Sequence, residues 1–195
     1  MTLASRKEWQ KPSIQQALNA ENNFLDVFKE SLTSDYIVEK PKEFKNIYQT
    51  VELSGSVLKE IYQPAVPITR HGIAPDFVIR NIKTGKSLYV EVKRQDGWVE
   101  GGVRADGRGN AHERCLKYFS PGLLNTLYSH SKIEAPSLPF WVVFQGNITR
   151  DPCRVREISL WFTGVEDHYF MWRPSHTGKN ILQHFDSKLK PLLDK

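Results

Sequence analysis

The sequence predicts an α/β domain with a mixed central β-sheet flanked by helices. Two β-rich runs lie on either side of a short glycine-containing turn within residues 76–93. An apolar run bounded by turn residues covers 138–146, and apolar residues recur at helical spacing near both ends of the chain. No proline- or glycine-rich tract divides the 195 residues, so we expect a single domain over residues 1–195.

The first elements in chain order are two helices. Apolar residues recur at roughly helical spacing over residues 13–32, where Ser13 is a plausible N-cap. A short helix is predicted over residues 56–62, and Pro64 and Pro67 end it because proline cannot continue a helix.

A β-hairpin is predicted next, over about residues 75–94. Its strands cover 76–80 and 87–93, and Thr84-Gly85 supplies the turn chemistry between them. Residues 95–109 contain five glycines, which predicts an irregular, mobile loop rather than a continuing strand.

The remaining predicted elements follow turn and capping signals. They are a helix capped by Asn110 that runs to Phe119, a helix from Pro121 to His130, a strand buried on both faces at 138–146, strands at 156–162 and 169–172, and an amphipathic helix at 178–193.

Composition narrows the functional classes. Charged residues make up 25% and apolar residues 39%, which is typical of soluble globular proteins. No segment has the apolar length needed to span a bilayer and the N-terminus lacks a hydrophobic signal core, so we expect a cytoplasmic protein without a membrane partner. The net charge of +5 is compatible with a phosphate-bearing partner without requiring one. Cys115 and Cys153 are too few for a disulfide framework and badly spaced for zinc.

The predicted hairpin carries two acids and a lysine that can converge. Because side chains alternate along a strand, Glu91 and Lys93 share one face. Hairpin pairing can bring Asp76 alongside Glu91, and two close carboxylates repel unless positive charge lies between them. A Mg²⁺ ion suits oxygen ligands of this kind, and the lysine could hold or help deprotonate a water aimed at phosphorus. The alternative is an exposed ion pair of little energetic value.

A second pattern, GRGNAHER, lies in a predicted recognition segment over about residues 107–119. If Asn110 caps the helix, then Asn110, Glu113 and Arg114 lie on one side of its first turn. These residue types hydrogen-bond to base edges in the major groove. The alternative is an ordinary helix start with a cap and an intrahelical acid–base arrangement.

The spacing P-D, fourteen residues, then E-x-K resembles the catalytic signature of the PD-(D/E)xK nucleases, whose core is a mixed sheet flanked by helices. The segments EVKRQDGWVEG, GRGNAHER, LPFWVVF, ITRDP, RVREI and YFMWRP are similar to the MunI-like type II restriction endonucleases, which cleave CAATTG. The shorter pattern G-N-A-x-E-R is shared with EcoRI, whose site has the same AATT centre.

The resemblance implies a restriction-endonuclease-like core and a set of residue roles. Asp76, Glu91 and the Val92 carbonyl would hold Mg²⁺, and Lys93 would serve the attacking water. Arg108 would read the outer C:G pair, while Asn110, Ala111, Glu113 and Arg114 would read the inner AATT. Candidates for the DNA backbone are Lys42, Lys45, Arg94 and Arg104, for each of which a solvated side chain is the alternative.

The resemblance also implies partners. A palindromic site in double-stranded DNA implies a homodimer. The resemblance to restriction endonucleases further implies a location in the prokaryotic cytoplasm and no organic cofactor. Each subunit would cut one strand before the first A and leave 5′-AATT overhangs. Three other interpretations remain open: a repair or structure-selective nuclease with the same hairpin, a sequence-specific DNA-binding protein without nuclease activity, and a basic structural module that binds no nucleic acid. Trp98 either packs at the base of its loop, which we favour, or lines the dimer contact, and we expect His112 to be packed or solvent-facing rather than catalytic.

Overall fold

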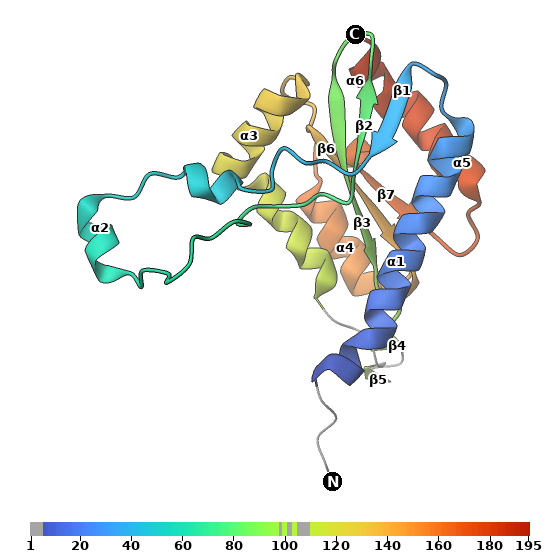
Figure 1. The fold of residues 1–195 in the computed structure, drawn as a ribbon. Helices are drawn as coiled ribbons and strands as arrows, with labels where there is room; N and C mark the ends of the chain where they lie inside the picture. The colour runs from blue at the N-terminus through green and yellow to red at the C-terminus, as the bar shows by residue number, and fades with distance from the viewer. Residues whose placement is uncertain (1–5, 98, 101–102, 105–109) are drawn as a thin grey trace.

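A computed structural model describes residues 6–97, 99–100, 103–104 and 110–195 of the chain. Its main sheet has five strands in the order β1-β2-β3-β6-β7, with bounds Tyr36–Glu39, Phe77–Asn81, Ser87–Arg94, Phe140–Gln145 and Tyr169–Trp172. The first three strands are antiparallel neighbours, whereas β3, β6 and β7 run parallel (Figure 1). The predicted mixed sheet flanked by helices is therefore confirmed.

The described part of the chain also contains six α-helices and several short helices. The α-helices are α1 (Arg6–Ser31), α2 (Gly55–Glu60), α3 (Pro121–Ser131), α4 (Pro152–Trp161), α5 (Gly178–His184) and α6 (Lys190–Asp194). The 3₁₀ helices are η1 (Ile47–Thr50), η2 (Ala111–Phe119), η3 (Asn147–Thr149) and η4 (Glu166–His168), and η5 (Phe185–Leu189) is a π-helical turn. None of the helices described is long and apolar enough to cross a membrane.

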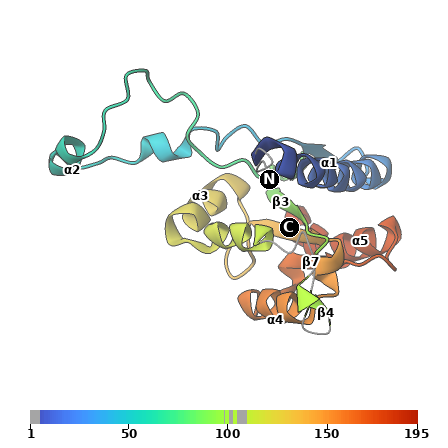
Figure 2. The same cartoon turned by 90° about the horizontal axis from the view of Figure 1, so that it is seen from below.

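Both faces of the sheet are buried. Val90 and Val92 of β3 face a core that includes Phe24 and Phe28 of α1 and Phe185 of η5. The opposite face of the sheet packs against η2, α3 and α4, as Figure 2 shows from below. Because β3 runs between these two layers, its C-terminal half is screened from water on both sides.

The hairpin prediction is confirmed in position and register. Phe77 pairs with Val90 and Arg80 with Ser87, and Gly85 takes the positive φ of 71° that its turn requires. The alternation expected along β3 also holds, since Val90 and Val92 lie in one core while Glu91 faces η2.

One predicted strand is wrong. Residues 156–162 belong mainly to α4, which Pro152 begins. The Asp151 side chain caps this helix by accepting from the backbone N–H groups of Cys153 and Arg154 at 3.0 and 3.3 Å. Asp followed by Pro is a helix-start signal, and it outweighs the alternating pattern that suggested a strand.

Two further differences concern short elements. The edge strand β1 was not expected, and its pairing with β2 accounts for it. Within the loop predicted over residues 95–109, β4 (Val99–Glu100) and β5 (Val103–Arg104) form a two-stranded ribbon, while Trp98 lies outside the described residues.

Candidate active site

The acidic pair lies where β2 begins and β3 approaches its end. The pairing of Phe77 with Val90 places the preceding Asp76 beside Glu91. The Asp76 Oδ2 atom accepts a hydrogen bond of 2.7 Å from the backbone N–H of Val92, which fixes the carboxylate against β3. Strand pairing and one backbone hydrogen bond therefore bring together two acids that are 15 positions apart in sequence.

Lys93 completes a three-residue cluster. Its Nζ atom forms an ion pair with Glu91 and lies 3.8 Å from Asp76 Oδ2. The same ammonium donates to the Val92 carbonyl oxygen at 3.4 Å. The side chains predicted from sequence to form the catalytic set thus meet at one point, where they are largely shielded from solvent.

Burial and mutual repulsion set the electrostatics of this cluster. Burial, together with the negative charge of Glu91, raises the pKa of Asp76 to about 7. Burial alone would lower the pKa of Lys93, but the two carboxylates outweigh it and raise the pKa. With both acids ionised, the three side chains carry a net negative charge that favours a bound cation.

Two side chains of η2, Tyr118 and Cys115, are buried near the acidic pair, and Tyr118 contacts it directly. The Tyr118 hydroxyl donates a 2.8 Å hydrogen bond to Glu91 Oε2, and burial beside Glu91 raises the pKa of this tyrosine. Cys115 is also buried, and its thiol pKa is raised to about 12. Sequence reasoning missed Tyr118, because helical spacing shows only that this position is buried and not which strand residue it meets.

The donor set suits a hard divalent cation. The Asp76 and Glu91 carboxylates and the Val92 carbonyl offer oxygen atoms only, which are the ligands that Mg²⁺ and Ca²⁺ prefer. Among the described residues, no group of three or more His, Cys, Asp and Glu side chains could hold a metal. The chemistry of the cluster therefore matches Mg²⁺ with additional water or phosphate ligands rather than zinc.

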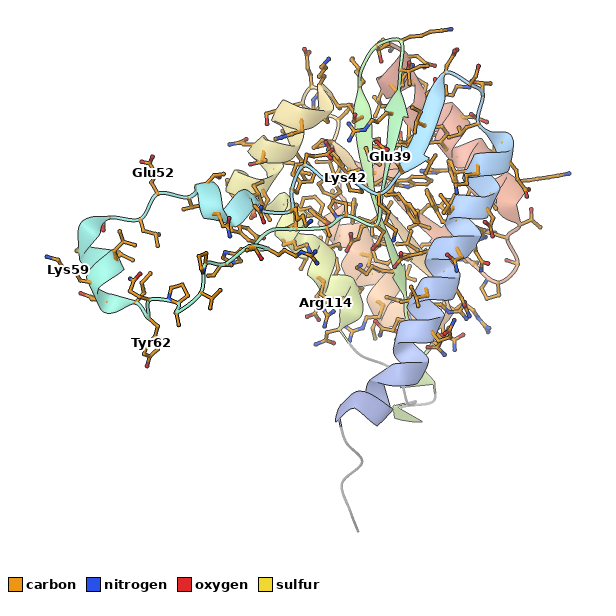
Figure 3. All side chains as sticks on the ribbon, viewed as in Figure 1. Glu39, Lys42, Glu52, Lys59, Tyr62 and Arg114 are labelled. Carbon is orange, nitrogen blue, oxygen red and sulfur yellow. The ribbon has the colours of Figure 1, made fainter. Side chains whose placement is uncertain are left out.

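The recognition segment is a 3₁₀ helix rather than an α-helix. Asn110 occupies the N-cap position of η2, but its side chain makes no capping hydrogen bond, contrary to the prediction. In 3₁₀ geometry residues i and i+3 eclipse, so Glu113 lies above Asn110 while Arg114 is rotated around the helix. Asn110, Glu113 and Arg114 are all exposed, and Arg114 reaches toward the lower end of the molecule in Figure 3.

Two predicted base-reading residues are described only in part or not at all. Ala111 begins η2, but its side chain lies outside the description. Arg108, the candidate for the outer base pair, also lies outside the described residues.

A polar network of α4 and η2 side chains contacts Asn110 on the side that faces α4. Arg154 of α4 donates to Asn110 Oδ1 at 3.2 Å and to Glu157 Oε2 at 2.6 Å. His112 is fully buried, lies 3.1 Å from the same Glu157 oxygen and stacks on Trp161. The expectation that His112 packs rather than reacts agrees with this position. Sequence reasoning missed both residues: Glu157 lies in the segment that was predicted as a strand, and Arg154 precedes that segment without a pattern that links it to Asn110.

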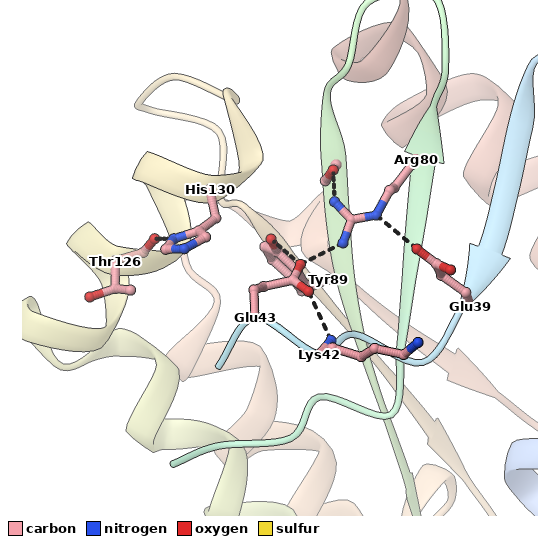
Figure 4. A network of polar contacts seen from close by, with 8 residues as sticks. Glu39, Lys42, Glu43, Arg80, Tyr89, Thr126 and His130 are labelled. Atoms are coloured by element: carbon pink, nitrogen blue, oxygen red, sulfur yellow. Dashed lines mark hydrogen bonds and ion pairs between the residues drawn. The ribbon is translucent and has the colours of Figure 1, made fainter. Parts of the chain in front are cut away.

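The four residues predicted to contact the DNA backbone lie in different surroundings. Lys42 and Lys45 are exposed and line a cavity of about 430 Å³ together with Arg70. Beside them Glu43 accepts hydrogen bonds from Arg80 and Tyr89, which fixes this stretch to the sheet while the Lys42 side chain points away (Figure 4).

The other two candidates are on or near the far end of β3. Arg94 is partly buried and pairs with Asp96 at 3.0 Å, so this charge is already balanced. Arg104 ends β5, but its side chain is not described.

Comparison with known proteins identifies close relatives. A family model described as "Type II restriction enzyme MunI" matches residues 1–194. The type II restriction enzyme MunI from Mycoplasma sp is 48% identical over 197 residues, covering 98% of each chain. The crystal structure of MunI restriction endonuclease in complex with cognate DNA superimposes with a TM-score of 0.80 and covers 98% of this chain and 100% of that one.

Proposed function

This chain belongs to the MunI family of type II restriction enzymes, and we propose that it cleaves both strands of duplex DNA at CAATTG, before the first A. The observation that carries the proposal is the meeting of Asp76, Glu91 and Lys93 at the junction of β2 and β3. A side-chain set of this type, beside an exposed recognition segment, is what phosphodiester hydrolysis at a chosen sequence needs. The solved relative in complex with cognate DNA supports duplex DNA as the partner.

In the proposed reaction, Asp76, Glu91 and the Val92 carbonyl hold Mg²⁺. Bound there, Mg²⁺ lowers the pKa of water and neutralises charge on the phosphoryl group. Lys93 positions the attacking water, because its ammonium lies within reach of both carboxylates. The Val92 N–H and the Tyr118 hydroxyl orient the two carboxylates, and hydrolysis leaves a 5′-phosphate and a 3′-hydroxyl.

Base selection is assigned to the segment around the start of η2. Arg108 reads the outer C:G pair, and Asn110, Ala111, Glu113 and Arg114 read the inner AATT. Because Arg154 donates to Asn110 Oδ1, it orients the amide, whose nitrogen can then donate to a base acceptor. Lys42, Lys45, Arg94 and Arg104 contact the sugar-phosphate backbone.

The palindrome requires a homodimer, since a two-fold axis presents one recognition segment and one active site to each half-site. Each subunit then cuts one strand and leaves a 5′-AATT overhang. We place this activity in the prokaryotic cytoplasm, where the enzyme meets DNA.

The test is a digest of two plasmids, one with a single CAATTG and the other with a single GAATTC, in Mg²⁺ and in EDTA. We expect the CAATTG plasmid to be linearised only with Mg²⁺, and end sequencing to place the cut before the first A. An intact CAATTG plasmid would refute the proposal. Cleavage of GAATTC instead would refute only the outer base-pair assignment.

A further inference from the structure

Residues 49–72 form an arm that projects from the body of the molecule (Figures 1 and 3). Every residue of this arm is exposed, and its only α-helix, α2, has no buried residue. In Figure 3 the labelled side chains Glu52, Lys59 and Tyr62 all point away from the body. The arm therefore contributes no side chain to either hydrophobic core.

The root of the arm is nevertheless well defined. The backbone N–H of Tyr48 donates to the His71 carbonyl at 3.0 Å, and that of Ile73 donates to the Phe44 carbonyl at 3.2 Å. A Cβ at Gly72 would lie only 1.9 Å from the Phe44 carbonyl oxygen, so glycine permits the outgoing and returning chains to pass this closely. The returning chain reaches the catalytic Asp76 four residues later.

The arm is unusually apolar for an exposed segment. Eight of the thirteen exposed large hydrophobic residues in the described chain lie on it: Val51, Leu53, Val57, Leu58, Ile61, Tyr62, Val66 and Ile68. Tyr62 is fully exposed. Monomeric proteins rarely leave such a concentration of apolar side chains in water, and larger exposed patches mark interaction sites.

Charge distinguishes between a DNA partner and a protein partner. The arm carries Glu52 and Glu60 against Lys59 and Arg70, so its formal charge is zero although the whole chain carries +5. Surfaces that follow a nucleic acid backbone are rich in Lys and Arg, because affinity comes from neutralising phosphates. A neutral, apolar arm therefore fits another protein surface better than a duplex.

We propose that the arm docks on a second copy of this chain and is a main contact of the homodimer. The inference rests on the proposed function, because a two-fold enzyme brings a second copy next to each recognition segment. In both views the arm leaves the body on the side where α3 lies (Figures 1 and 2). Helix α3 in turn contacts η2, which begins in the recognition segment. Its roughly two dozen residues match the roughly 20–30 residues that each side of a standard interface contributes.

The experiment compares two double variants by sedimentation equilibrium without DNA. Leu58→Gln/Ile61→Gln removes apolar surface from the arm, and Ile37→Gln/Ile82→Gln removes similarly exposed apolar residues from the body. We expect the arm variant to raise the dimer dissociation constant at least tenfold and the body variant to leave it unchanged. Both should keep the wild-type circular dichroism spectrum, because the substituted side chains are exposed, whereas the Tm of the arm variant falls as far as the dimer stabilises the fold.

A photo-crosslinking residue at position 62 provides an independent measurement. Tyr62 is fully exposed, so its replacement should leave the fold intact and yield a covalent dimer on irradiation. Three results would overturn the inference: a monomeric wild type at tens of micromolar, an arm variant that dimerises normally, or an arm variant that loses only DNA binding. Wild-type plasmid cleavage is scored separately, so an active enzyme with a dispensable arm contradicts this inference alone.

Discussion

At the scale of single residues, the site consists of three charged side chains that are largely shielded from solvent. Asp76 and Glu91 are brought together by strand pairing, and Lys93 compensates only one of the two negative charges. Because burial raises the cost of an uncompensated charge, the cluster favours either a proton on Asp76 or a bound cation. In the proposed function, the same three residues hold the metal ion and position the attacking water.

The first prediction concerns Asp76→Ala. We expect the cleavage rate to fall on the order of 10³-fold or more, because several kcal/mol of metal-assisted stabilisation are lost. Specific binding to CAATTG should be retained, since the base-reading residues are unchanged. A plasmid digest and an electrophoretic mobility shift measure the two properties. Asp35→Ala is the control, because Asp35 pairs with Lys83 at the surface, and cleavage that survives in Asp76→Ala would contradict the metal assignment.

The second prediction concerns the network below the recognition segment. Arg154→Met leaves Asn110 Oδ1 without its donor, so the amide can rotate and accept as well as donate. We expect discrimination against a substituted inner base pair to fall by roughly 1–3 kcal/mol, the value of one good base contact. Arg156→Met, on the same helix but exposed, is the control. Equal selectivity in both variants, measured by relative kcat/KM, would mean that Arg154 does not position Asn110.

At the scale of elements, helix type and capping decide what the recognition segment presents. The 3₁₀ form of η2 aligns Asn110 with Glu113. The Asp151 cap fixes where α4 begins, and α4 carries the Arg154 side chain that contacts Asn110.

Hydrogen bonds of the His168 side chain connect the segments that precede β6 and β7. The Leu138 N–H donates to His168 Nε2 at 3.1 Å, and Nδ1 lies 2.9 Å from the Phe140 carbonyl, so the buried ring bridges η4 and the start of β6 as a neutral imidazole.

The third prediction follows from that imidazole. Burial lowers the pKa of His168 to about 4, from an ordinary value near 6.5. Between these pH values the unfolded chain binds a proton that the folded chain does not, so the free energy of unfolding falls as pH falls. The loss from this residue is on the order of 3 kcal/mol by pH 4.

Urea unfolding between pH 7 and pH 4 tests this prediction. His168→Gln should be less stable at pH 7 but should lose less stability on acidification than the wild type. His130→Gln replaces an exposed imidazole and serves as the control. An unchanged pH slope in His168→Gln would exclude this residue as a source of acid sensitivity.

At the scale of the whole molecule, the proposed function gives each subunit one catalytic cluster and one recognition segment. Under that proposal, cutting both strands of a palindrome needs two copies arranged by a two-fold axis. We propose that the apolar side chains of the arm contact a protein partner, and that the cavity lined by Lys42, Lys45 and Arg70 at the root of the arm contacts DNA.

The fourth prediction uses mixed dimers. A heterodimer of wild type and Asp76→Ala, isolated through two different affinity tags, should nick a supercoiled plasmid and accumulate open circles. A heterodimer of wild type and Asp35→Ala should linearise it without that accumulation. Gel electrophoresis separates the forms. Efficient linearisation by the Asp76→Ala heterodimer would show that one active site cuts both strands.

The sequence alone was enough for the mixed sheet, the hairpin and the family. The sheet and the hairpin depend on local information, such as a two-residue period along β3 and turn chemistry at Gly85. The family came from the resemblance of segments such as GRGNAHER to known restriction endonucleases. Arg108 and the inner base-reading roles also come from the sequence, and they stay predictions that the structure does not test.

Only the tertiary structure decided which residues support the site. Tyr118 meets Glu91, and Arg154 meets Asn110, across 27 and 44 positions. Such contacts depend on how η2 and α4 pack on the sheet, and no local pattern encodes that packing. The strand wrongly predicted at 156–162 has a different cause, because the local helix-start signal of Asp151 and Pro152 outweighs the alternating pattern there. Local periodicity specifies elements, whereas the distances on which chemistry depends arise when those elements pack together.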